Sequence, residues 1–331
     1  MTSPRVICLG EILFDLLADQ PGRSIDQVTS WTAYPGGAPA NVACALTKLG
    51  TPAAFIGCVG EDTAGNTLVE LLQETGVDWS GVQRHSIAPT RAVYVVRSIA
   101  GDRQFAGFGD RSTTEFADTR LRADLLPVDL FDSAEFLVLG TLEMAYPESY
   151  NAILKALELA DHHNLKILVD VNWRPMFWSN PADALPIIQD LVKRIDFLKL
   201  SVEEAEMLFG TRDPGAIAHR SDSLEGVLVT DGGEGCAYCL SNNEGKLSAF
   251  AMDVEDTTGA GDSFVAGFLH QVCQKGVHAL GDADTAHAMV TYASAVGALT
   301  TTRAGAIAAQ PTGAEVEAFL YLNRLESVNQ G

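Results

Sequence analysis

Seven consecutive residues combine the types that a phosphate site needs. Asp256-Thr-Thr-Gly-Ala-Gly-Asp262 places Gly259, Ala260 and Gly261 directly ahead of a predicted helix with an apolar face. Small residues let successive backbone N–H groups point at one spot, and a helix N-terminus adds partial positive charge. The segment therefore predicts an anion hole for a phosphate, with the Asp262 carboxylate beside it.

A simpler interpretation of Asp262 is a helix cap, because aspartate is a favoured N-cap residue. Capping alone does not account for seven constrained residues in a row with a second aspartate, Asp256, at the front. We therefore favour a role beside the phosphate hole over capping alone.

The elements that must position this segment alternate between strands and helices. Apolar strands are predicted at residues 6–9, 53–59, 136–139, 166–171, 197–200 and 226–230, with helices between them and three more after residue 260. The alternation predicts an α/β fold built on a doubly wound, mostly parallel sheet. Three helices at the end are expected near 261–275, 282–299 and 313–326.

Two stretches, approximately 11–35 and 90–110, break this rhythm. The first predicts short strands at 12–18 and 28–33, and the second predicts strands at 91–99 and 103–108 around a turn at 100–102. We expect them to form a small accessory β-sheet, a lid inserted in one domain that spans residues 1–331.

A further hairpin is predicted at 236–250, with its turn at Asn242-Asn-Glu-Gly245. Cys236 and Cys239 within it have CxxC spacing but stand without a second pair or a histidine cluster. Residues three apart on a strand face opposite sides, so two packed cysteines are favoured over a zinc or redox site.

Composition limits the partners. The 22 basic and 43 acidic side chains give a net charge of −21, which disfavours binding to nucleic acid or to an anionic membrane. No apolar run reaches the ~20 residues of a membrane helix, and the N-terminus lacks a signal-peptide cleavage pattern. Cysteines inside apolar segments suit a reducing compartment. We expect a cytoplasmic protein.

The segment Asp256–Asp262 closely resembles the second signature of the ribokinase-like (PfkB) carbohydrate kinase family. A first signature is expected near residue 40, where Gly36-Gly-Ala-Pro-Ala-Asn41-Val-Ala and Gly57-Cys-Val-Gly60-Glu-Asp62 resemble it. The resemblance runs from residue 6 to about residue 311. It implies a ribokinase-like fold and transfer of the γ-phosphate of ATP onto a sugar hydroxyl.

The resemblance also implies roles for individual residues. Asp262 resembles the general base, and Gly259, Ala260 and Gly261 resemble the anion hole for the transferring phosphate. The implied sugar-binding residues are Asp15, Gly36, Gly37, Asn41, Asn172 and Asp262, with Phe105 and Asp110 as contacts from the accessory sheet. The implied ATP-binding residues are Lys199, Ser201, Thr230, Gly232, Gly233, Gly235, Thr258, Gly259 and Gly261.

Taken singly, some of these residues have structural interpretations: Gly37 as a turn glycine, Asn41 as a helix-start residue, and the glycines after Thr230 as a plain strand-to-turn loop.

The same resemblance implies sites for metal ions. Ser201-Val-Glu-Glu204 matches a family segment that carries Asn in place of Ser201, and Glu204 would organise Mg²⁺ through water. Asp256, Thr258 and carbonyls near residues 302–305 resemble a potassium site. The expected cofactors are therefore ATP, Mg²⁺ and K⁺.

The sugar is suggested by Asp170-Val-Asn172-Trp-Arg174-Pro-Met-Phe-Trp178, which resembles a fructokinase segment. Arg174 would be a catalytic residue near the phosphates or a substrate oxyanion, although a structural ion pair is an alternative. The run from Arg103 to Ser112 departs from the fructokinase pattern. Kinases of ribose or 2-keto-3-deoxygluconate therefore remain alternatives, and the cations available for an acid sugar are Arg91, Arg103, Arg111 and Arg174.

Other classes fit less well. A non-catalytic sugar or nucleotide sensor on this fold would be expected to lose Asp262 or the Gly-Ala-Gly hole, and both are present. No GxGxxG motif follows the first strand, as a dinucleotide-binding dehydrogenase requires, and no Walker-type phosphate loop is found. A homodimer formed through the accessory strands is a further expectation, because sheet edges invite pairing.

Overall fold

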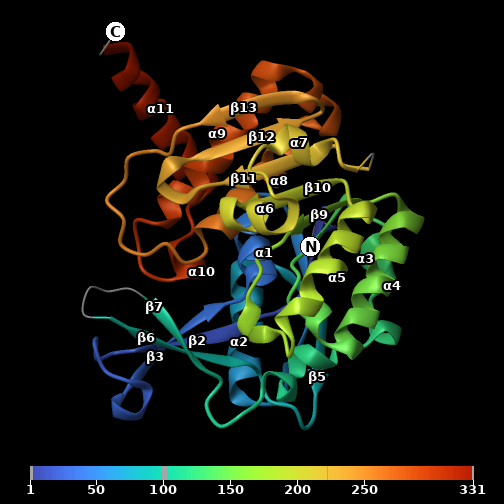
Figure 1. The fold of residues 1–331 in the computed structure, drawn as a ribbon, viewed down its shortest axis with the longest axis vertical. Helices are drawn as coiled ribbons and strands as arrows, with labels where there is room; N and C mark the ends of the chain where they lie inside the picture. The colour runs from blue at the N-terminus through green and yellow to red at the C-terminus, as the bar shows by residue number, and fades with distance from the viewer. Residues whose placement is uncertain (1–2, 99–102, 222, 330–331) are drawn as a thin grey trace.

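The computed structural model describes residues 3–98, 103–221 and 223–329, in which the strands form two sheets (Figure 1). The large sheet has nine strands in the order β13-β12-β11-β10-β9-β8-β1-β4-β5. Their bounds are Val6–Leu9 (β1), Ala53–Gly60 (β4), Asp78–His85 (β5), Phe136–Leu139 (β8), Lys166–Asp170 (β9), Phe197–Ser201 (β10), Gly226–Thr230 (β11), Cys236–Leu240 (β12) and Asn243–Leu247 (β13). The strands from β11 to β5 are parallel, and β12 and β13 add an antiparallel edge.

Helices cover both faces of this sheet. One face packs against α1 (Ala38–Leu49), α2 (Thr63–Thr75), α8 (Ala260–Lys275), α9 (Ala283–Thr300) and α11 (Gly313–Asn329). The other packs against α3 (Val128–Phe131), α4 (Pro147–His163), α5 (Ala184–Leu191), α6 (Val202–Phe209) and α7 (Pro214–Ala218). Alternate residues of β1 enter the two cores, Val6 and Cys8 on one side and Ile7 and Leu9 on the other. The predicted doubly wound α/β fold is therefore confirmed.

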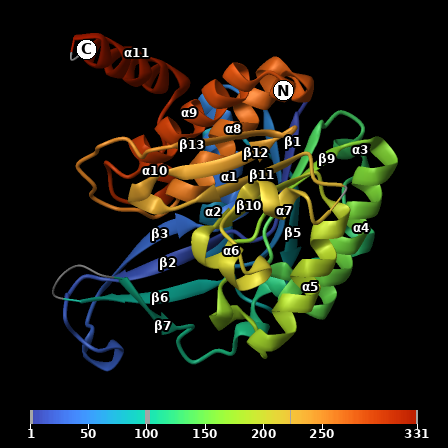
Figure 2. The ribbon, with the colours of Figure 1, turned by 45° about the horizontal axis from the view of Figure 1, so that its top comes forward.

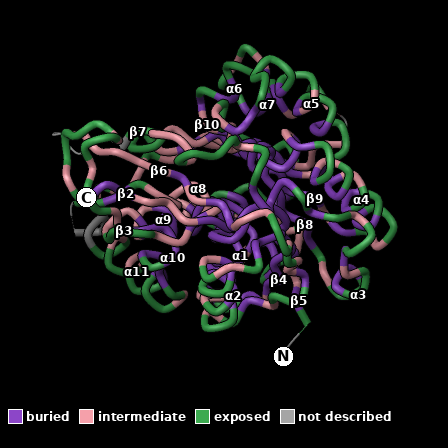
Figure 3. Tube along the Cα trace, turned by 90° about the horizontal axis from the view of Figure 1, so that it is seen from below, coloured by how far each residue is buried: buried purple, intermediate pink, exposed green. Residues whose placement is uncertain are grey.

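The second sheet is small and less buried. It has the order β3-β2-β6-β7, with bounds Leu13–Ala18 (β2), Trp31–Gly36 (β3), Ala92–Arg97 (β6) and Arg103–Gly107 (β7). Figure 2 shows it grouped apart from the large sheet, with α11 leading away from the body of the molecule. Figure 3 shows the contrast between the purple central strands and the mostly pink strands of this small sheet. The predicted turn at 100–102 lies outside the described residues.

Two local predictions were wrong, and one strand was not predicted. β5 was not predicted, because its sequence, Asp-Trp-Ser-Gly-Val-Gln-Arg-His, has no apolar run; it lies at the sheet edge, where polar side chains meet solvent. The turn of the last hairpin is at Ser241 and Asn242, whose φ values of 48° and 68° suit a two-residue loop. The strand predicted at 28–33 begins three residues later and runs to Gly36.

Two further observations concern the cysteines and the membrane. All six cysteines are buried and free, which agrees with a packing role for Cys236 and Cys239. Among the helices within the described ranges, none has the length and apolar character that crossing a bilayer requires.

Candidate active site

Asp262 and Asn41, which belong to the two predicted signatures, meet in space. The Asn41 side chain in the first turn of α1 donates a hydrogen bond of 2.8 Å from Nδ2 to Oδ2 of Asp262, in the first turn of α8. The N-cap of α8 is Gly259 rather than Asp262, so the capping interpretation of Asp262 is wrong. Its carboxylate is instead held by a residue 221 positions away.

The charge state of Asp262 follows from its surroundings. Burial raises the pKa of Asp262 to about 6, and the charge of Asp170 contributes to the rise. The hydrogen bond from Asn41 and the positive charges of Lys199 and Arg174 act in the opposite direction. A carboxyl group with this pKa is largely ionised at neutral pH and still basic enough to accept a proton from an attacking hydroxyl.

The start of α8 needs its small residues. Gly259 has a φ of 76°, and a Cβ there would lie 2.8 Å from Cβ of Ala306. A Cβ on Gly261 would lie 3.1 Å from Nζ of Lys199. The first N–H groups of a helix have no acceptor within the helix, so this turn offers donors to an anion, with the Lys199 ammonium alongside.

Lys199 and Asp170 form a buried ion pair at the carboxyl ends of two neighbouring strands, β10 and β9. Nζ of Lys199 lies 3.0 Å from Oδ2 of Asp170, and their side chains are 9% and 7% exposed. Burial lowers the pKa of Lys199, but the Asp170 carboxylate outweighs this effect and the net pKa is raised, so the ammonium persists. Asp170 has no predicted role of its own, because only the fold brings it beside Lys199 and within electrostatic range of Asp262.

Glu204 connects two loops of the site. Its Oε1 accepts a hydrogen bond of 2.7 Å from the Trp173 N–H, and its Oε2 accepts one of 2.7 Å from the Ser201 N–H. Ser201 in turn caps α6 through its hydroxyl, so the two residues form a capping box. Glu204 therefore fixes the segment that carries Asn172 and Arg174, while its predicted role toward Mg²⁺ stays a prediction.

Asn172 and Arg174 follow β9, as the sequence indicated. Asn172 is half-buried with a φ of 38°, and Arg174 is exposed and donates from Nη1 to the Trp173 carbonyl at 3.2 Å. Arg174 acts on Asp262 only through its charge. The described residues contain no cluster of three His, Cys, Asp or Glu side chains arranged as a metal site; this is compatible with Mg²⁺ held largely by phosphate oxygens and water.

A pocket of about 340 Å³ opens beside the anion hole. Four residues of the predicted nucleotide loop line it: Thr230, Gly232, Gly233 and Gly235. Ala260 and Gly261 form its boundary with the anion hole, and Phe250, Met252, Val254, Phe264 and Ala298 give it an apolar lining. The sequence did not predict that most of these apolar residues line a pocket. Residues 249–254 follow β13 without helix or strand, so their apolar side chains show no helical or strand periodicity.

Four of the predicted sugar-binding residues, Asp15, Gly36, Gly37 and Asn41, lie where β2 and β3 meet α1. A Cβ on Gly36 would lie 3.0 Å from Oδ2 of Asp15, and one on Gly37 would lie 2.5 Å from the Glu11 carbonyl oxygen. Gly37 also has a φ of 106°, which disfavours any other residue. The two glycines therefore let the small sheet approach the helix that presents Asn41.

Two predicted contacts from the small sheet lie farther out. Phe105, on β7, is 40% exposed and packs edge to face on Phe108, with ring centroids 5.1 Å apart. Asp110 is exposed beyond the end of β7. Among the described residues, neither Phe105 nor Asp110 forms a hydrogen bond with Asp262 or Asn41. Their contact with a sugar stays a prediction.

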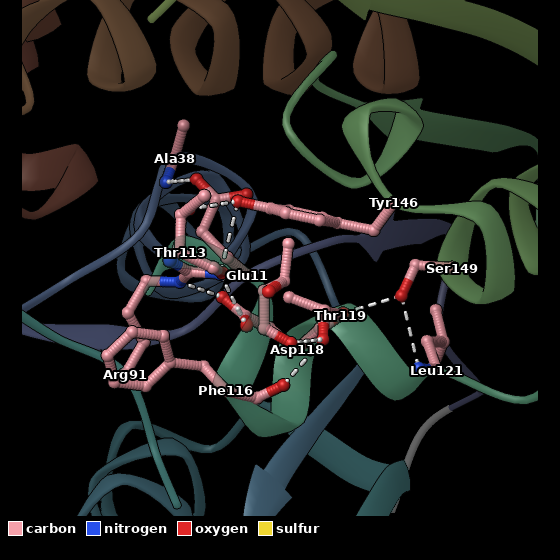
Figure 4. A network of polar contacts seen from close by, with 11 residues as sticks. Glu11, Ala38, Arg91, Thr113, Phe116, Asp118, Thr119, Leu121, Tyr146 and Ser149 are labelled. Carbon is pink, nitrogen blue, oxygen red and sulfur yellow. Dashed lines mark hydrogen bonds and ion pairs between the residues drawn. The ribbon is translucent and has the colours of Figure 1, made fainter. Parts of the chain in front are cut away.

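Arg91, which the sequence made available to an acid sugar, is fully buried. It forms an ion pair with Asp118, donating from Nη2 to Oδ1 at 2.8 Å (Figure 4). Its guanidinium carbon lies 4.6 to 5.5 Å from the ring centroids of Phe108, Phe116, Tyr146 and Phe177. Arg91 is therefore a structural residue, and its charge is already compensated.

Asp256 connects the anion-hole loop to the segment before α10 (Ala306–Ala309). Its Oδ1 accepts from the N–H and hydroxyl of Thr258 at 3.0 and 2.7 Å, and its Oδ2 accepts from the Gly305 N–H at 2.9 Å. These bonds join the two segments that the potassium prediction involves. The bonds themselves are structural, and the ion stays a prediction.

Comparisons with known proteins agree with this geometry. A family model described as "pfkB family carbohydrate kinase" matches residues 3–313. Fructokinase-1 of Zea mays is 34% identical over 314 residues, which cover 94% of this chain and 96% of that protein. Fructokinase-2 of Solanum lycopersicum is 32% identical over 322 residues, covering 96% of this chain and 97% of that protein.

Solved structures give the same result. The crystal structure of a fructokinase with bound ATP from Xylella fastidiosa is similar with a TM-score of 0.83 and 28% identity, covering 96% of this chain and 98% of that one. A double mutant of the Vibrio cholerae O395 fructokinase, in a form with bound fructose, ADP and potassium ion, has a TM-score of 0.83 and 29% identity, with the same coverage.

Proposed function

This chain belongs to the pfkB family of carbohydrate kinases, and from that premise we propose that it is a fructokinase, which converts ATP and D-fructose to ADP and D-fructose 6-phosphate. The observation that carries the proposal is the hydrogen bond between Asn41 and Asp262. It joins the first signature, which holds the predicted sugar-binding residue Asn41, to the second signature, which forms the anion hole. The fructokinase relatives support the choice of sugar.

The positions of the side chains support the following proposed reaction. The sugar hydroxyl lies against Asp262, whose carboxylate accepts its proton as the hydroxyl oxygen bonds to the γ-phosphorus and the bond from that phosphorus to the leaving ADP oxygen breaks. The N–H groups at Gly259, Ala260 and Gly261, together with Lys199, stabilise the negative charge on the transferring group. Asp15, Gly36, Gly37, Asn41 and Asn172 hold the sugar, with Phe105 and Asp110 contacting it from the small sheet.

The nucleotide occupies the 340 Å³ pocket beside the hole. The apolar lining that includes Phe250, Met252 and Val254 suits a base, and the loop of Thr230, Gly232, Gly233 and Gly235 suits the ribose and phosphates. Lys199, Ser201 and Thr258 complete the ATP-binding set. Glu204 would help to hold Mg²⁺, which would neutralise charge on the ATP phosphates, and Asp256 and Thr258 would hold K⁺.

An acid sugar is a weaker candidate than fructose. Its carboxylate needs a cation, and Arg91 is enclosed and paired with Asp118. Arg103, Arg111 and Arg174 are the other three arginines that the sequence made available to an acid sugar. The side chains of Arg111 and Arg174 are described, and both are exposed. A non-catalytic sensor would have no use for a buried carboxylate whose pKa is raised to about 6 beside an anion hole.

The assay that tests the proposal couples ADP release to a panel of sugars that includes fructose, ribose, glucose and 2-keto-3-deoxygluconate. We expect the highest kcat/KM with fructose, and the phosphate on its primary 6-hydroxyl. A kcat/KM for fructose far below that of another sugar would contradict the assignment. Chelation of divalent cations by EDTA should abolish turnover, and added Mg²⁺ should restore it; activity that survives EDTA would contradict the metal assignment.

The remaining parts of the proposal concern the whole protein. We place it in the cytoplasm, as one kinase domain in which strands of the small sheet form a lid over the sugar. The exposed edges of that sheet, β3 and β7, provide the surface for a homodimer. Light scattering coupled to size exclusion decides between a monomer of 35.3 kDa and a dimer.

A further inference from the structure

Two buried carboxylates, Glu11 and Glu143, lie behind the sugar side of the site. Glu11 follows β1 and Glu143 follows β8, and these strands are parallel neighbours, so both residues lie at the same edge of the sheet. Their exposed fractions are 4% and 1%. Gly10 makes room for them, because a Cβ there would lie 3.1 Å from Oε2 of Glu143. The reaction described above uses neither carboxylate.

Three of the four carboxylate oxygens have no hydrogen-bond partner among the described residues: Oε2 of Glu11 and both Oε1 and Oε2 of Glu143. The fourth, Oε1 of Glu11, accepts a hydrogen bond of 2.8 Å from the Ala38 N–H (Figure 4). An ionised carboxylate is strongly disfavoured at such burial without donors or a paired cation. A carboxylic acid that donates to a carboxylate would satisfy both groups.

The charges around the pair also favour one proton. Arg91 is the cation that acts on Glu143, but it is already paired with Asp118 and hydrogen-bonded to the Tyr146 hydroxyl. Burial raises the pKa of Glu11 to about 7, and the charges of Asp118 and Asp262 contribute. Burial also raises the pKa of Glu143 well above its usual value, and the charge of Glu11 raises it further. Two such neighbours do not both ionise at neutral pH.

Glu11 accepts the hydrogen bond that caps α1, and a proton shared with Glu143 would hold its carboxylate in place for this. The N-cap of α1 is Gly37, which has no side chain to cap the helix, and Pro39 lacks an N–H. The Ala38 N–H therefore takes its acceptor from Glu11, a residue outside the helix. Asn41 lies three residues farther along the same turn, where its side chain reaches Asp262.

We propose that Glu143 is a positioning residue for this kinase, which shares one proton with Glu11 and thereby holds the Glu11 carboxylate as the remote cap of α1. The cap fixes the turn that presents Asn41 to the sugar and to Asp262. The effect on sugar binding rests on the proposed function of Gly37 and Asn41, whereas the shared proton does not. Because burial raises the pKa of Glu143 well above its usual value, the shared proton is present at neutral pH and is lost as pH rises through that raised pKa.

Infrared spectroscopy tests the proton directly. A protonated carboxylic acid has a C=O stretch well above the carboxylate bands. We expect such a band in the wild-type protein at about pH 8, above the pKa of Glu11 and that of Asp262. The band should be absent in Glu143→Gln and retained in Glu148→Gln, whose parent residue is exposed on α4. Wild-type and Glu143→Gln spectra with the same protonated-acid bands would overturn the proposal.

Kinetics test the positioning. The assay uses whichever sugar the wild type turns over fastest, so it does not depend on fructose being the substrate. We expect the wild-type KM for that sugar to rise on the order of tenfold from about pH 8 to about pH 10, with a smaller change in kcat. Glu143→Gln, whose amide donates without titrating, should flatten this profile, and Glu148→Gln should not.

A third variant, Glu143→Ala, removes the side chain that donates a hydrogen bond to Glu11. It should lose sugar affinity at every pH, with rescue by glutamine at the same position. If this variant fails to fold, the glutamine arm still decides. Superimposable KM profiles for the wild type and Glu143→Gln, or a changed sugar preference in Glu143→Gln without a changed pH profile, would overturn the positioning role.

Discussion

At the scale of single residues, the site works through the balance of charge around Asp262. Burial and Asp170 favour its protonated form, while Asn41 and Lys199 favour the ionised form. The result is a carboxyl pKa of about 6, high enough for a base and low enough to be ionised at neutral pH. Each neighbour therefore adjusts the pH at which the base becomes active.

Removal of the Asn41 amide tests this balance. The hydrogen bond from Asn41 lowers the pKa of Asp262, so Asn41→Ala should raise that pKa and move the acid limb of the kcat profile to higher pH. The measurement is kcat at saturating sugar from about pH 5 to about pH 8. Asn66→Ala, on the exposed face of α2, is the control and should keep the wild-type limb. An unchanged limb in Asn41→Ala would contradict the charge balance.

At the scale of elements, the site residues lie at the ends of strands and the starts of helices. The sequence predicted the central strands and their helices, because buried parallel strands are apolar runs and the helices repeat with a period of 3.6 residues. It missed β5, whose polar edge sequence shows neither pattern, and it misplaced the hairpin turn, because Asn242-Asn-Glu-Gly245 looks more like a turn than Ser241-Asn242. Local patterns failed where pairing across the sheet decided the structure.

Gly37 at the start of α1 should be far less tolerant than Gly50 at its end. Both have a positive φ, 106° and 96°, but a Cβ would lie 2.5 Å from the Glu11 carbonyl oxygen at Gly37 and would meet nothing within 4 Å at Gly50. Gly50→Ala should cost about 1 kcal/mol in the free energy of unfolding, and Gly37→Ala should cost more and raise the sugar KM. Chemical denaturation with steady-state kinetics gives both quantities, and equal effects of the two substitutions would contradict this explanation.

The buried pair of Arg91 and Asp118 should be costly to break. Arg91→Met leaves the Asp118 carboxylate buried without its cation, so we expect a loss of about 3–5 kcal/mol in the free energy of unfolding. Adding Asp118→Leu should recover much of the loss, because an apolar pair replaces an ionic one. The control is Arg122→Met in an exposed pair with Asp124, whose loss should leave the free energy of unfolding almost unchanged. A small loss in Arg91→Met would show that the pair is not needed.

At the scale of the whole molecule, the site forms from segments that are distant in sequence. The resemblance of the two signatures predicted that Asn41 and Asp262 serve one sugar site. It did not predict the buried interactions of Asp170, Glu11 and Glu143, since nothing local in the sequence shows which carboxylates the sheet edge brings together. The apolar pocket lining at 249–254 also comes from tertiary packing alone.

Hydrogen exchange should separate the two halves of the site. If the sugar lies between the small sheet and α1, then sugar alone should slow amide exchange in β2, β3 and the first turn of α1. ATP with Mg²⁺ should instead protect residues 232–235 and 259–261. β5, at the far edge of the large sheet, serves as the internal control and should not change. Sugar-dependent protection that is confined to the nucleotide loop would contradict this division.

The most direct test of the central claim is sugar-dependent ADP release by Asp262→Asn compared with the wild type. The account predicts a loss in kcat of about 10²–10⁴, the contribution of a positioned general base. Sugar binding measured by calorimetry and the circular dichroism spectrum should stay close to those of the wild type, because the Asn side chain keeps the size of Asp. Near-normal turnover in Asp262→Asn would show that phosphoryl transfer does not depend on this carboxylate.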